Sequence, residues 1–470
     1  GMQLPNVVAQ SSAAFFRAAN PSTFSYAFLT VGNANLLTEY GTEEQIDTWV
    51  RPMLEGRYFG TMCLSEPDAG SSLADISSKA TKAADGTYRV TGTKMWITGG
   101  DHELSENIVH LVLAKVPGGG PGVKGISLFI VPKFLTDGTR NDVALVSLNH
   151  KMGNHGTTNA LLNFGDGSHQ PTDEPGAVGY LVGEEHRGLA YMFHMMNEAR
   201  VAVGSMATAI GYAGYLTSLE YAKVRTQGRP VGDKDPSRSQ VAIIEHADVK
   251  RMLLAQKSYV EGALALGLYS ARLVDEIKVL TGAERDEAEL MLEVLTPIAK
   301  SWPSQWCLEA NNLGIQIHGG YGYTTEYDVE QQYRDNRLNA IHEGTHGIHG
   351  IDLLGRKVVM QDGAGLKLLQ RRIGETVQTA LQSEATAAYA RDLQAQTERL
   401  VEVTAALWAA GDAETTLANS TAYLEAAGHI VMAWIWLEQL NAVGGNTGNF
   451  YDGKRAAAQY FFRYELPKVT

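Results

Sequence analysis

The pentapeptide His-Glu-Gly-Thr-His at residues 342–346 combines residue types that can do chemistry in two different ways. As H-E-x-x-H it matches the zinc-protease signature, in which two histidines on one helical face hold the metal and the glutamate is the base. As Glu-Gly-Thr it can present a carboxylate base with no metal at all. Both interpretations make Glu343 a general base.

The residues around the pentapeptide give the zinc interpretation little support. Gly344 and Thr345 are poor helix formers, so a continuous helical turn between the two histidines is not favoured. The extended metalloprotease pattern needs glycine at position 349 and histidine at position 352, where this chain has His349 and Asp352. His349 could still complete a three-histidine face, but the sequence favours a site without metal.

Composition bounds the class of protein. The chain has 470 residues, a formal net charge of −13, 19% charged and 44% hydrophobic residues, which predicts a globular protein of two or three domains. The negative charge repels polyanions, so we expect no nucleic-acid partner. Cys63 and Cys307 form no metal-binding pattern and suit a reducing compartment. No apolar run reaches the ~18 residues of a membrane span, and we expect a cytoplasmic protein.

Hydrophobic periodicity divides the chain into four regions of a multidomain α+β protein. Residues 1–57 have helical spacing, whereas 58–170 contain short β-rich runs separated by turn signals, which is typical of a β-barrel or sandwich. Residues 171–360 return to long helical segments with short links, as in an antiparallel bundle. Residues 361–470 are helical and alanine-rich, and predict either an extra C-terminal helical domain or a continuation of the bundle.

Four further motifs acquire meaning together with the pentapeptide. They are "CLSEPDAGSS" (63–72), "KMWITGG" (94–100), "YAKVRTQGRP" (221–230) and "QIHGGYGYTTEYDVEQQYRD" (316–335). In this order and at this spacing, up to about Lys357, the chain resembles the acyl-CoA dehydrogenase family of flavoproteins. The part past Gly363 resembles the extra helical domain of a subgroup that includes methylmercaptopropionyl-CoA dehydrogenases.

The resemblance implies a helical N-terminal domain, a central β domain and a four-helix bundle, with FAD between the last two. Residues 1–57 match the end of the first domain, so we expect that domain to be truncated here. The implied reaction is FAD-dependent α,β-dehydrogenation of an acyl-CoA thioester to the trans-2-enoyl-CoA. Glu343 would remove the α-proton and flavin N5 would accept the β-hydride.

The resemblance also implies roles for individual residues. Gly344 leaves room for a ligand against the backbone, and it would line the substrate site with His342 and Ser71. The implied cofactor-binding residues are Leu64, Ser65, Gly70, Ser71, Trp96, Thr98, Arg225, Gln316, Gly319, Gly320 and Thr345.

Some of these residues also have a structural explanation. Glu343 could cap or pair with a helix, Trp96 could be a core aromatic residue, and the glycines at 319–320 could end a helix. Arg334 and Asp335 could buttress the Glu343 loop, although an ordinary ion pair is the favoured interpretation. The chain also departs from the family pattern, because one residue is missing between Arg225 and Gly228.

The expected partners follow from the same resemblance. They are an acyl-CoA substrate, an electron-transfer flavoprotein as acceptor, and further copies of this chain in a homodimer or homotetramer, because Arg225 would reach a neighbouring subunit's FAD. An alternative is an acyl-CoA oxidase that uses O₂. A DNA-associated alkylation-response flavoprotein is disfavoured, because residues 361–470 carry 9 Lys and Arg against 12 Asp and Glu.

Overall fold

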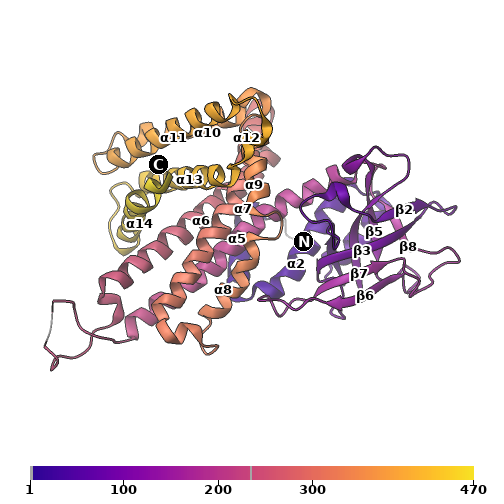
Figure 1. Ribbon diagram of the computed structural model, residues 1–470, viewed down its shortest axis with the longest axis horizontal. Coiled ribbons are helices and arrows are strands. Elements are labelled where there is room, and N and C mark those ends of the chain that lie inside the picture. The colour runs from indigo at the N-terminus through magenta and orange to yellow at the C-terminus, as the bar shows by residue number, and fades with distance from the viewer. Residues whose placement is uncertain (1–3, 233–234, 470) are drawn as a thin grey trace. The chain divides into compact units, whose positions relative to one another are not determined.

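The computed structural model describes residues 4–232 and 235–469 (Figure 1). The chain forms two compact units, one from Asn20 to Ala199 and the other from Arg200 onward together with the first helix, α1 (Asn6–Ala19). The first unit is rich in strands and the second is helical, which confirms the α+β class expected from the sequence.

Short helices open the first unit. Asn20 caps the first of these by accepting a hydrogen bond from the Thr23 N–H, and Thr42 forms a capping box with Gln45. These elements are α2 (Pro21–Tyr40), α3 (Glu43–Gln45), the π-helical turn Ile46–Val50 and α4 (Arg51–Leu54).

Eight strands make the β-barrel region of the first unit. In the sheet order β1-β4-β5-β8-β3-β7-β6, β2 pairs with both β3 and β4 and so closes β4, β5, β8, β3 and β2 into a ring. The short β-rich runs expected within residues 58–170 coincide with six of these strands, whereas the short β2 was not expected and β8 lies beyond residue 170. The strands are β1 (Tyr58–Cys63), β2 (Lys79–Lys82), β3 (Tyr88–Thr98), β4 (Asn107–Lys115), β5 (Ile126–Pro132), β6 (Val143–Leu148), β7 (Asn159–Phe164) and β8 (Ala177–Leu181).

Strand β4 is buried on both faces, which explains its nearly continuous apolar sequence. Leu111 and Leu113 pack into the cluster that includes α2 residues, whereas Val112 and Ala114 pack into the cluster inside the ring. Successive side chains of β4 therefore point alternately into two different hydrophobic cores.

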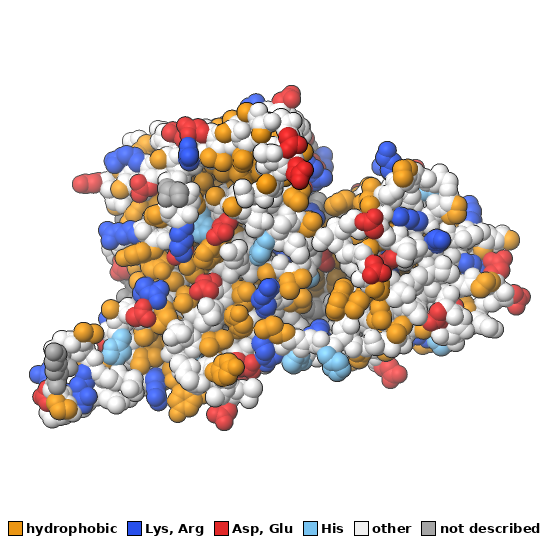
Figure 2. Space-filling model, in the orientation of Figure 1, with side chains coloured by type: hydrophobic (Ala, Val, Ile, Leu, Met, Phe, Trp, Pro, Cys, Tyr) orange, Lys and Arg blue, Asp and Glu red, His pale blue; other side chains and the backbone are white. Residues whose placement is uncertain are grey.

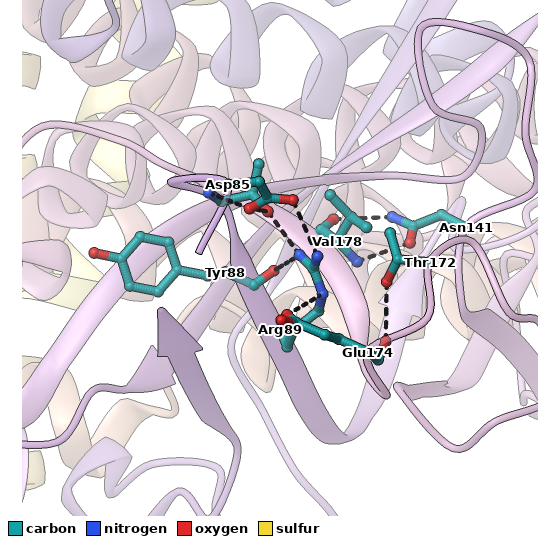
Figure 3. Close-up of polar contacts among 8 residues, drawn as sticks. Asp85, Tyr88, Arg89, Asn141, Thr172, Glu174 and Val178 are labelled. Carbon is teal, nitrogen blue, oxygen red and sulfur yellow. Dashed lines mark hydrogen bonds and ion pairs between the residues drawn. The ribbon is translucent and has the colours of Figure 1, made fainter. Parts of the chain in front are cut away.

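Polar side chains lock the strand ends of this unit (Figure 3). The buried Arg89 guanidinium, at the start of β3, pairs with Asp85 at 3.1 Å and with Glu174 at 3.4 Å. The Asn141 side chain donates to the Val178 carbonyl at 2.9 Å and accepts from the Val178 N–H at 2.8 Å. These contacts fix β3 and β8, and β3 carries residues of the candidate site.

Long helices dominate the second unit. The long helical segments expected within residues 171–360 are confirmed, and the first of them is α5, whose 37 residues begin in the first unit and continue into the second. Helices α6 and α7 lie side by side (Figure 1). The main elements are α5 (Gly188–Val224), α6 (Ala247–Val279), α7 (Gly282–His318), α8 (Val329–Arg337) and α9 (His346–Asp352).

The C-terminal helices share one hydrophobic core with the bundle helices of the second unit. Chain direction changes at Gln361, Asp362 and Gly363, which all have positive φ angles. One compact unit includes the residues on both sides of position 360. The domain boundary predicted there therefore stays a prediction. The helices are α10 (Met360–Ala380), α11 (Ala387–Trp408), α12 (Ala413–Leu417), α13 (Ser420–Val443) and α14 (Asn449–Tyr460).

Surface charge is mixed. On the face shown in Figure 2, basic and acidic side chains are interspersed rather than gathered into one broad region of a single sign. None of the helices in the described ranges is both long and apolar enough to cross a membrane.

Candidate active site

In the first unit, a buried ion pair joins the two motifs that the sequence singled out. Lys94 of β3 is fully buried, and its Nζ lies 2.9 Å from Glu66 Oε1 and donates to the Leu64 carbonyl at 3.0 Å. The Met95 N–H donates to the Ser65 carbonyl at 2.9 Å. These bonds hold the loop after β1 against the end of β3, so the structure brings these two predicted segments together.

The Glu66 carboxylate is fully engaged. It accepts hydrogen bonds from the N–H and hydroxyl groups of Ser77 and Ser78 at 2.6–3.0 Å. Burial acts to raise the pKa of Glu66, but Lys94 and these hydrogen bonds outweigh it and hold the pKa at about 2. Glu66 therefore stays ionised and serves the structure of the loop.

Trp96 stands out on this surface. Its side chain is 58% exposed, so the alternative of a core aromatic residue is wrong. Its φ of 66° lies in the left-handed region at a register shift of β3 between Lys94 and Ile97. A bulky residue that combines a strained backbone with an exposed apolar ring is typical of a binding surface.

The other expected cofactor residues of this unit have room for a ligand. Leu64, Ser65 and Thr98 are partly buried, whereas Gly70 and Ser71 are exposed. A Cβ on Gly70 would meet no atom within 4 Å, so the chain's own packing leaves this backbone approachable. An exposed indole beside hydroxyl and backbone donors fits an aromatic, hydrogen-bonding ring system such as a flavin.

In the second unit, four of the other expected cofactor residues, namely Arg225, Gln316, Gly319 and Gly320, lie at the end of α7, whereas Thr345 is the N-cap residue of α9. The Arg225 guanidinium lies 5.4 Å from the centre of the Tyr321 ring, and Tyr321 belongs to the turn that contains Gly319 and Gly320. Gly319 ends the helix with φ 62°, so the helix-ending interpretation holds for this residue. Gly320 and Gln316 are exposed. A Cβ on Gly319 or Gly320 would meet no atom within 4 Å, so a ligand can approach this backbone, and a guanidinium and an amide are donors that fit a pyrophosphate.

Glu343 lies in a tight loop rather than on a helix. Both Glu343 (φ 55°) and Gly344 (φ 97°) have left-handed backbones, and α9 begins only at His346. The two histidines of the pentapeptide therefore do not share a helical face. The zinc signature in the sequence is not matched by a zinc-protease helix in the fold.

Two buried side chains hold this loop. The fully buried Lys300 of α7 donates from Nζ to the Gly344 carbonyl at 2.5 Å. The fully buried His349 of α9 donates from Nε2 to the Glu343 carbonyl at 3.0 Å. A Cβ on Gly344 would lie 2.7 Å from that same nitrogen, so glycine is required at this position.

Close helix packing brings positive charge to the loop. A Cβ at Gly204 would lie 1.8 Å from the Ala299 carbonyl, so glycine permits α5 and α7 to touch there. Arg200, one turn earlier on α5, is buried and pairs with Asp352 of α9 at 3.6 Å. The guanidinium also acts electrostatically on Glu343.

Buried asparagines fix the chain that leads into the loop. The Asn336 side chain donates to the Ala207 carbonyl of α5 at 3.1 Å and to Asn311 Oδ1 of α7 at 2.7 Å. Asn339 in turn donates to Asn336 Oδ1 at 2.9 Å. Arg334 pairs with Glu330 of its own helix at 2.6 Å, as the favoured ion-pair interpretation predicted.

The electrostatics of the loop suit a base. Burial raises the pKa of Glu343 to about 7, although Arg200 and Lys300 act to lower it. Burial also lowers the pKa of Lys300 to about 7. A carboxyl group with a pKa in this range can both accept and release a proton near neutral pH.

The three histidines near Glu343 stay neutral. Burial lowers the pKa of His342 and of His346 to about 4, and that of His349 to about 3. His342 donates from Nδ1 to the Leu338 carbonyl at 3.0 Å. Within the described ranges, no three His, Cys, Asp or Glu side chains are grouped so that they could hold a metal ion.

Sequence reasoning missed several residues of this site. Lys300 lies on a helix that looks ordinary in the sequence, His349 was considered only as a possible metal ligand, and Arg200 was assigned no role. The available signals were Pro297 and Pro303, which flank the lysine inside α7. A charged residue in an otherwise apolar helix segment is rarely buried without a specific partner.

Comparison with known proteins agrees with these features. Residues 61–166 match a family model described as acyl-CoA dehydrogenase, middle domain, and residues 186–358 match one described as acyl-CoA dehydrogenase, C-terminal domain. Residues 369–470 match a model described as acetyl-CoA dehydrogenase C-terminal like.

Solved structures show the same fold. An acyl-CoA dehydrogenase from Bacillus anthracis, complexed with FAD, has a TM-score of 0.80 at 20% identity and covers 100% of this chain and 77% of its own. A structure described as the electron transferring flavoprotein of Acidaminococcus fermentans has a TM-score of 0.63 at 25% identity and covers 77% of this chain and 84% of its own.

A curated relative shows the family. The 3-methylmercaptopropionyl-CoA dehydrogenase of Ruegeria pomeroyi is 37% identical over 490 residues, which cover 100% of this chain and 80% of the relative. This likeness also confirms the subgroup that the region past Gly363 predicted. The chain therefore belongs to the acyl-CoA dehydrogenase family, whose members are FAD-binding oxidoreductases that act on acyl-CoA.

Proposed function

We propose that the protein oxidises an acyl-CoA thioester to the trans-2-enoyl-CoA, with Glu343 as the base that removes the α-proton. The observation that carries this proposal is a partly buried carboxyl group whose pKa is raised to about 7, on a strained loop held by buried donors. Bound FAD supplies the acceptor for the β-hydride at flavin N5.

The residues proposed for the substrate site have different roles. Glu343 takes the proton from the carbon next to the thioester carbonyl and must lie within hydrogen-bond reach of it. Gly344 lets the substrate lie against the backbone because it has no Cβ. His342 and Ser71 would shape the substrate site. The neutral state of His342 suits an apolar acyl group.

We propose that the expected cofactor residues of each unit bind FAD. In the first, the exposed Trp96 ring would pack on the flavin ring, and Leu64, Ser65, Gly70, Ser71 and Thr98 would supply hydroxyl and backbone groups. In the second, Arg225 would bind pyrophosphate oxygens beside Gln316, Gly319 and Gly320, with Thr345 on the flavin side. The donor types and the exposure of Trp96 support this assignment.

A spectroscopic titration tests the reaction. Purified protein, reconstituted with FAD where needed, should be yellow and should bleach under anaerobic conditions with a fitting acyl-CoA. A panel should include 3-methylmercaptopropionyl-CoA, because the curated relative with 37% identity acts on that substrate by name. Straight-chain acyl-CoAs of increasing length complete the panel. A protein that cannot be loaded with FAD would sink the proposal.

The electron acceptor remains a separate proposal. The family resemblance favours an electron-transfer flavoprotein, whereas an acyl-CoA oxidase would pass electrons to O₂. Exposure of the bleached, product-bound enzyme to air distinguishes the two. We expect slow reoxidation in air and fast reoxidation by an electron-transfer flavoprotein. Rapid reoxidation in air would assign the oxidase activity instead.

We also propose a homodimer or homotetramer. Arg225 is exposed at the end of α5 and lies over Tyr321, so one surface of the second unit presents both expected FAD segments. In the proposed assembly Arg225 reaches the FAD of a neighbouring subunit, through an interface of more than ~2,000 Å². Light scattering that finds a stable monomer with full FAD occupancy would refute the assembly.

A further inference from the structure

The peptide that carries the proposed base has an unusual backbone. Glu343 and Gly344 are consecutive residues with φ angles of 55° and 97°. Glutamate has a Cβ and rarely adopts the left-handed region, so this conformation persists only where the surroundings hold it. The direction of the Glu343 side chain depends on this backbone, because the left-handed turn sets where its Cβ points.

Two buried donors from different helices hold the two successive carbonyl groups. Lys300 of α7 binds the Gly344 carbonyl at 2.5 Å, and His349 of α9 binds the Glu343 carbonyl at 3.0 Å. Both side chains are fully buried. The second ring nitrogen of His349, Nδ1, has no hydrogen-bond partner in the described part of the chain, so the bond to the Glu343 carbonyl defines how this ring sits.

We propose that Lys300 and His349 are the positioning residues of the base: together they clamp the Glu343–Gly344 peptide, and the Lys300 ammonium presents its positive charge to Glu343. This inference rests on the proposed function, in which Glu343 removes the α-proton. Neither residue touches the reacting atoms, so both act through Glu343.

The placement of Lys300 argues for more than a structural hydrogen bond. Its Nζ binds a carbonyl, and the ion pairs of the described residues do not join it to the Glu343 carboxylate. A neutral donor could hold the carbonyl without the cost of burying an ammonium group. Lys300 is protonated below its own pKa of about 7, and there its charge acts on Glu343 and favours the ionised form, which is the form that can accept a proton.

The other charged groups around Glu343 must be counted as well. Arg200 acts on Glu343 from α5 in the same direction as Lys300. Asp352 of α9 pairs with Arg200 and so reduces its effect. Arg356 also pairs with Asp352, at 3.2 Å, and Arg200 acts on the buried Lys357. Further titratable groups are the neutral histidines His342, His346 and His349, and Arg337 at the end of α8, which acts on His346.

Substitution of Lys300 tests the charge. Lys300→Met keeps most of the side-chain volume and removes the ammonium group. Two readouts follow the base: the pH dependence of flavin reduction by acyl-CoA in the holoenzyme, and the infrared carboxyl band of Glu343 in FAD-free protein, assigned by its loss in Glu343→Gln. We expect both to move to higher pH by about one unit or more. Lys151→Met is the matched control, because Lys151 also donates to a backbone carbonyl, that of Thr157, and should move neither.

A pair of substitutions at His349 tests the clamp. His349→Gln can still donate to the Glu343 carbonyl, whereas His349→Leu cannot. Misplacement of a catalytic group by ~1 Å can cost ~10²-fold in rate. We therefore expect His349→Leu to lose about that much flavin reduction with FAD content unchanged, and His349→Gln to retain most of the rate. The pair decides the clamp even where Lys300→Met does not accumulate as folded protein.

The outcomes separate this inference from the proposed function. Retained flavin reduction in Glu343→Gln would overturn the base itself and both proposals with it. If Glu343→Gln is inactive but Lys300→Met leaves both pH profiles unmoved, the charge role is wrong. If His349→Gln and His349→Leu lose the same amount of flavin-reduction rate, the proposed role of His349 in clamping the Glu343–Gly344 peptide is wrong.

Discussion

Each unit of the protein contains a fully buried lysine close to a glutamate, and the two pairs differ in what the lysine binds. In the β unit, Lys94 pairs directly with the Glu66 carboxylate, which also accepts four serine hydrogen bonds. In the helical unit, Lys300 binds the backbone next to Glu343 and leaves that carboxylate without those donors. Glu66 has a pKa of about 2, and Glu343 has a pKa raised by burial to about 7.

The comparison shows that a buried lysine near a glutamate can either stabilise the fold or support a catalytic base. Hydrogen bonds to the ionised form and a directly paired cation stabilise Glu66 as a carboxylate, so it cannot accept a proton near neutral pH. Desolvation without those hydrogen bonds leaves Glu343 able to do so. Each of the following substitutions tests this division.

The largest expected effect is on catalysis at Glu343. Glu343→Gln keeps the side-chain volume but removes the basic carboxylate, and a positioned base contributes ~10²–10⁴-fold. We expect flavin reduction by acyl-CoA to fall by at least ~10²-fold, measured by stopped-flow absorbance. FAD content should persist, because the proposed role of Glu343 does not include holding the cofactor. Activity close to that of the unsubstituted protein would contradict the assignment.

The same substitution at Glu66 should damage stability rather than the chemical step. Glu66→Gln leaves Lys94 buried without its anion, which typically costs ~3–5 kcal/mol. Urea denaturation measures the change in the free energy of unfolding. The double substitution Lys94→Met with Glu66→Leu is the control, because removal of both charges should cost less than removal of one. A stable Glu66→Gln protein would show that the ion pair does not hold the loop.

The sequence predicted neither lysine–glutamate pair, although Glu66 and Lys94 lie within two of the motifs that carry the resemblance and Glu343 was predicted as the base. The periodicity of apolar residues located six strands and the 37-residue helix α5, because burial imposes that periodicity directly. It missed the short β2 and β8. The Glu343 motif was found by resemblance, but its support from Lys300 and His349 depends on which helices pack together. Packing of α5 on α7 at Gly204 is a tertiary event with no local sequence signal.

The two glutamates should also give stability opposite dependences on pH. The folded pKa of Glu66, about 2, lies below the unfolded value near ~4.3, so its contribution is present above ~4.3 and is lost as pH falls toward 2. A shift of this size corresponds to on the order of 3 kcal/mol. The folded pKa of Glu343 is raised to about 7, so its contribution is present below ~4.3 and is lost as pH rises through 7.

Urea denaturation at a series of pH values tests both signs. In a plot of the free energy of unfolding against pH, Glu66→Gln should flatten the acidic part of the curve and leave the part near neutral pH unchanged. Glu343→Gln should flatten the part near neutral pH and leave the acidic part unchanged. If neither substitution changes the limb assigned to it, the contrast between the two carboxyl groups is wrong.

A smaller effect is expected at Trp96, on cofactor affinity alone. The exposed indole packs little against its own chain, so Trp96→Ala should change the free energy of unfolding by no more than about 0.5 kcal/mol. Loss of an aromatic stacking partner should weaken FAD binding by about tenfold. Titration of FAD fluorescence measures the affinity, and Trp96→Phe should restore part of it. Unchanged affinity in Trp96→Ala would place the flavin ring elsewhere.

The smallest effect is expected at His346, which also separates the two interpretations of the pentapeptide. His346 begins α9 after the left-handed Glu343–Gly344 turn, and burial lowers its pKa to about 4, so it carries no charge beside the base. His346→Ala should therefore leave FAD content unchanged and alter flavin reduction far less than Glu343→Gln. A zinc site would reverse this order, because loss of one histidine ligand would abolish activity. Metal analysis of the purified protein gives an independent measurement: stoichiometric zinc that disappears in His346→Ala would show that the pentapeptide binds metal after all. The backbone turn between the two histidines is the physical reason to expect the opposite.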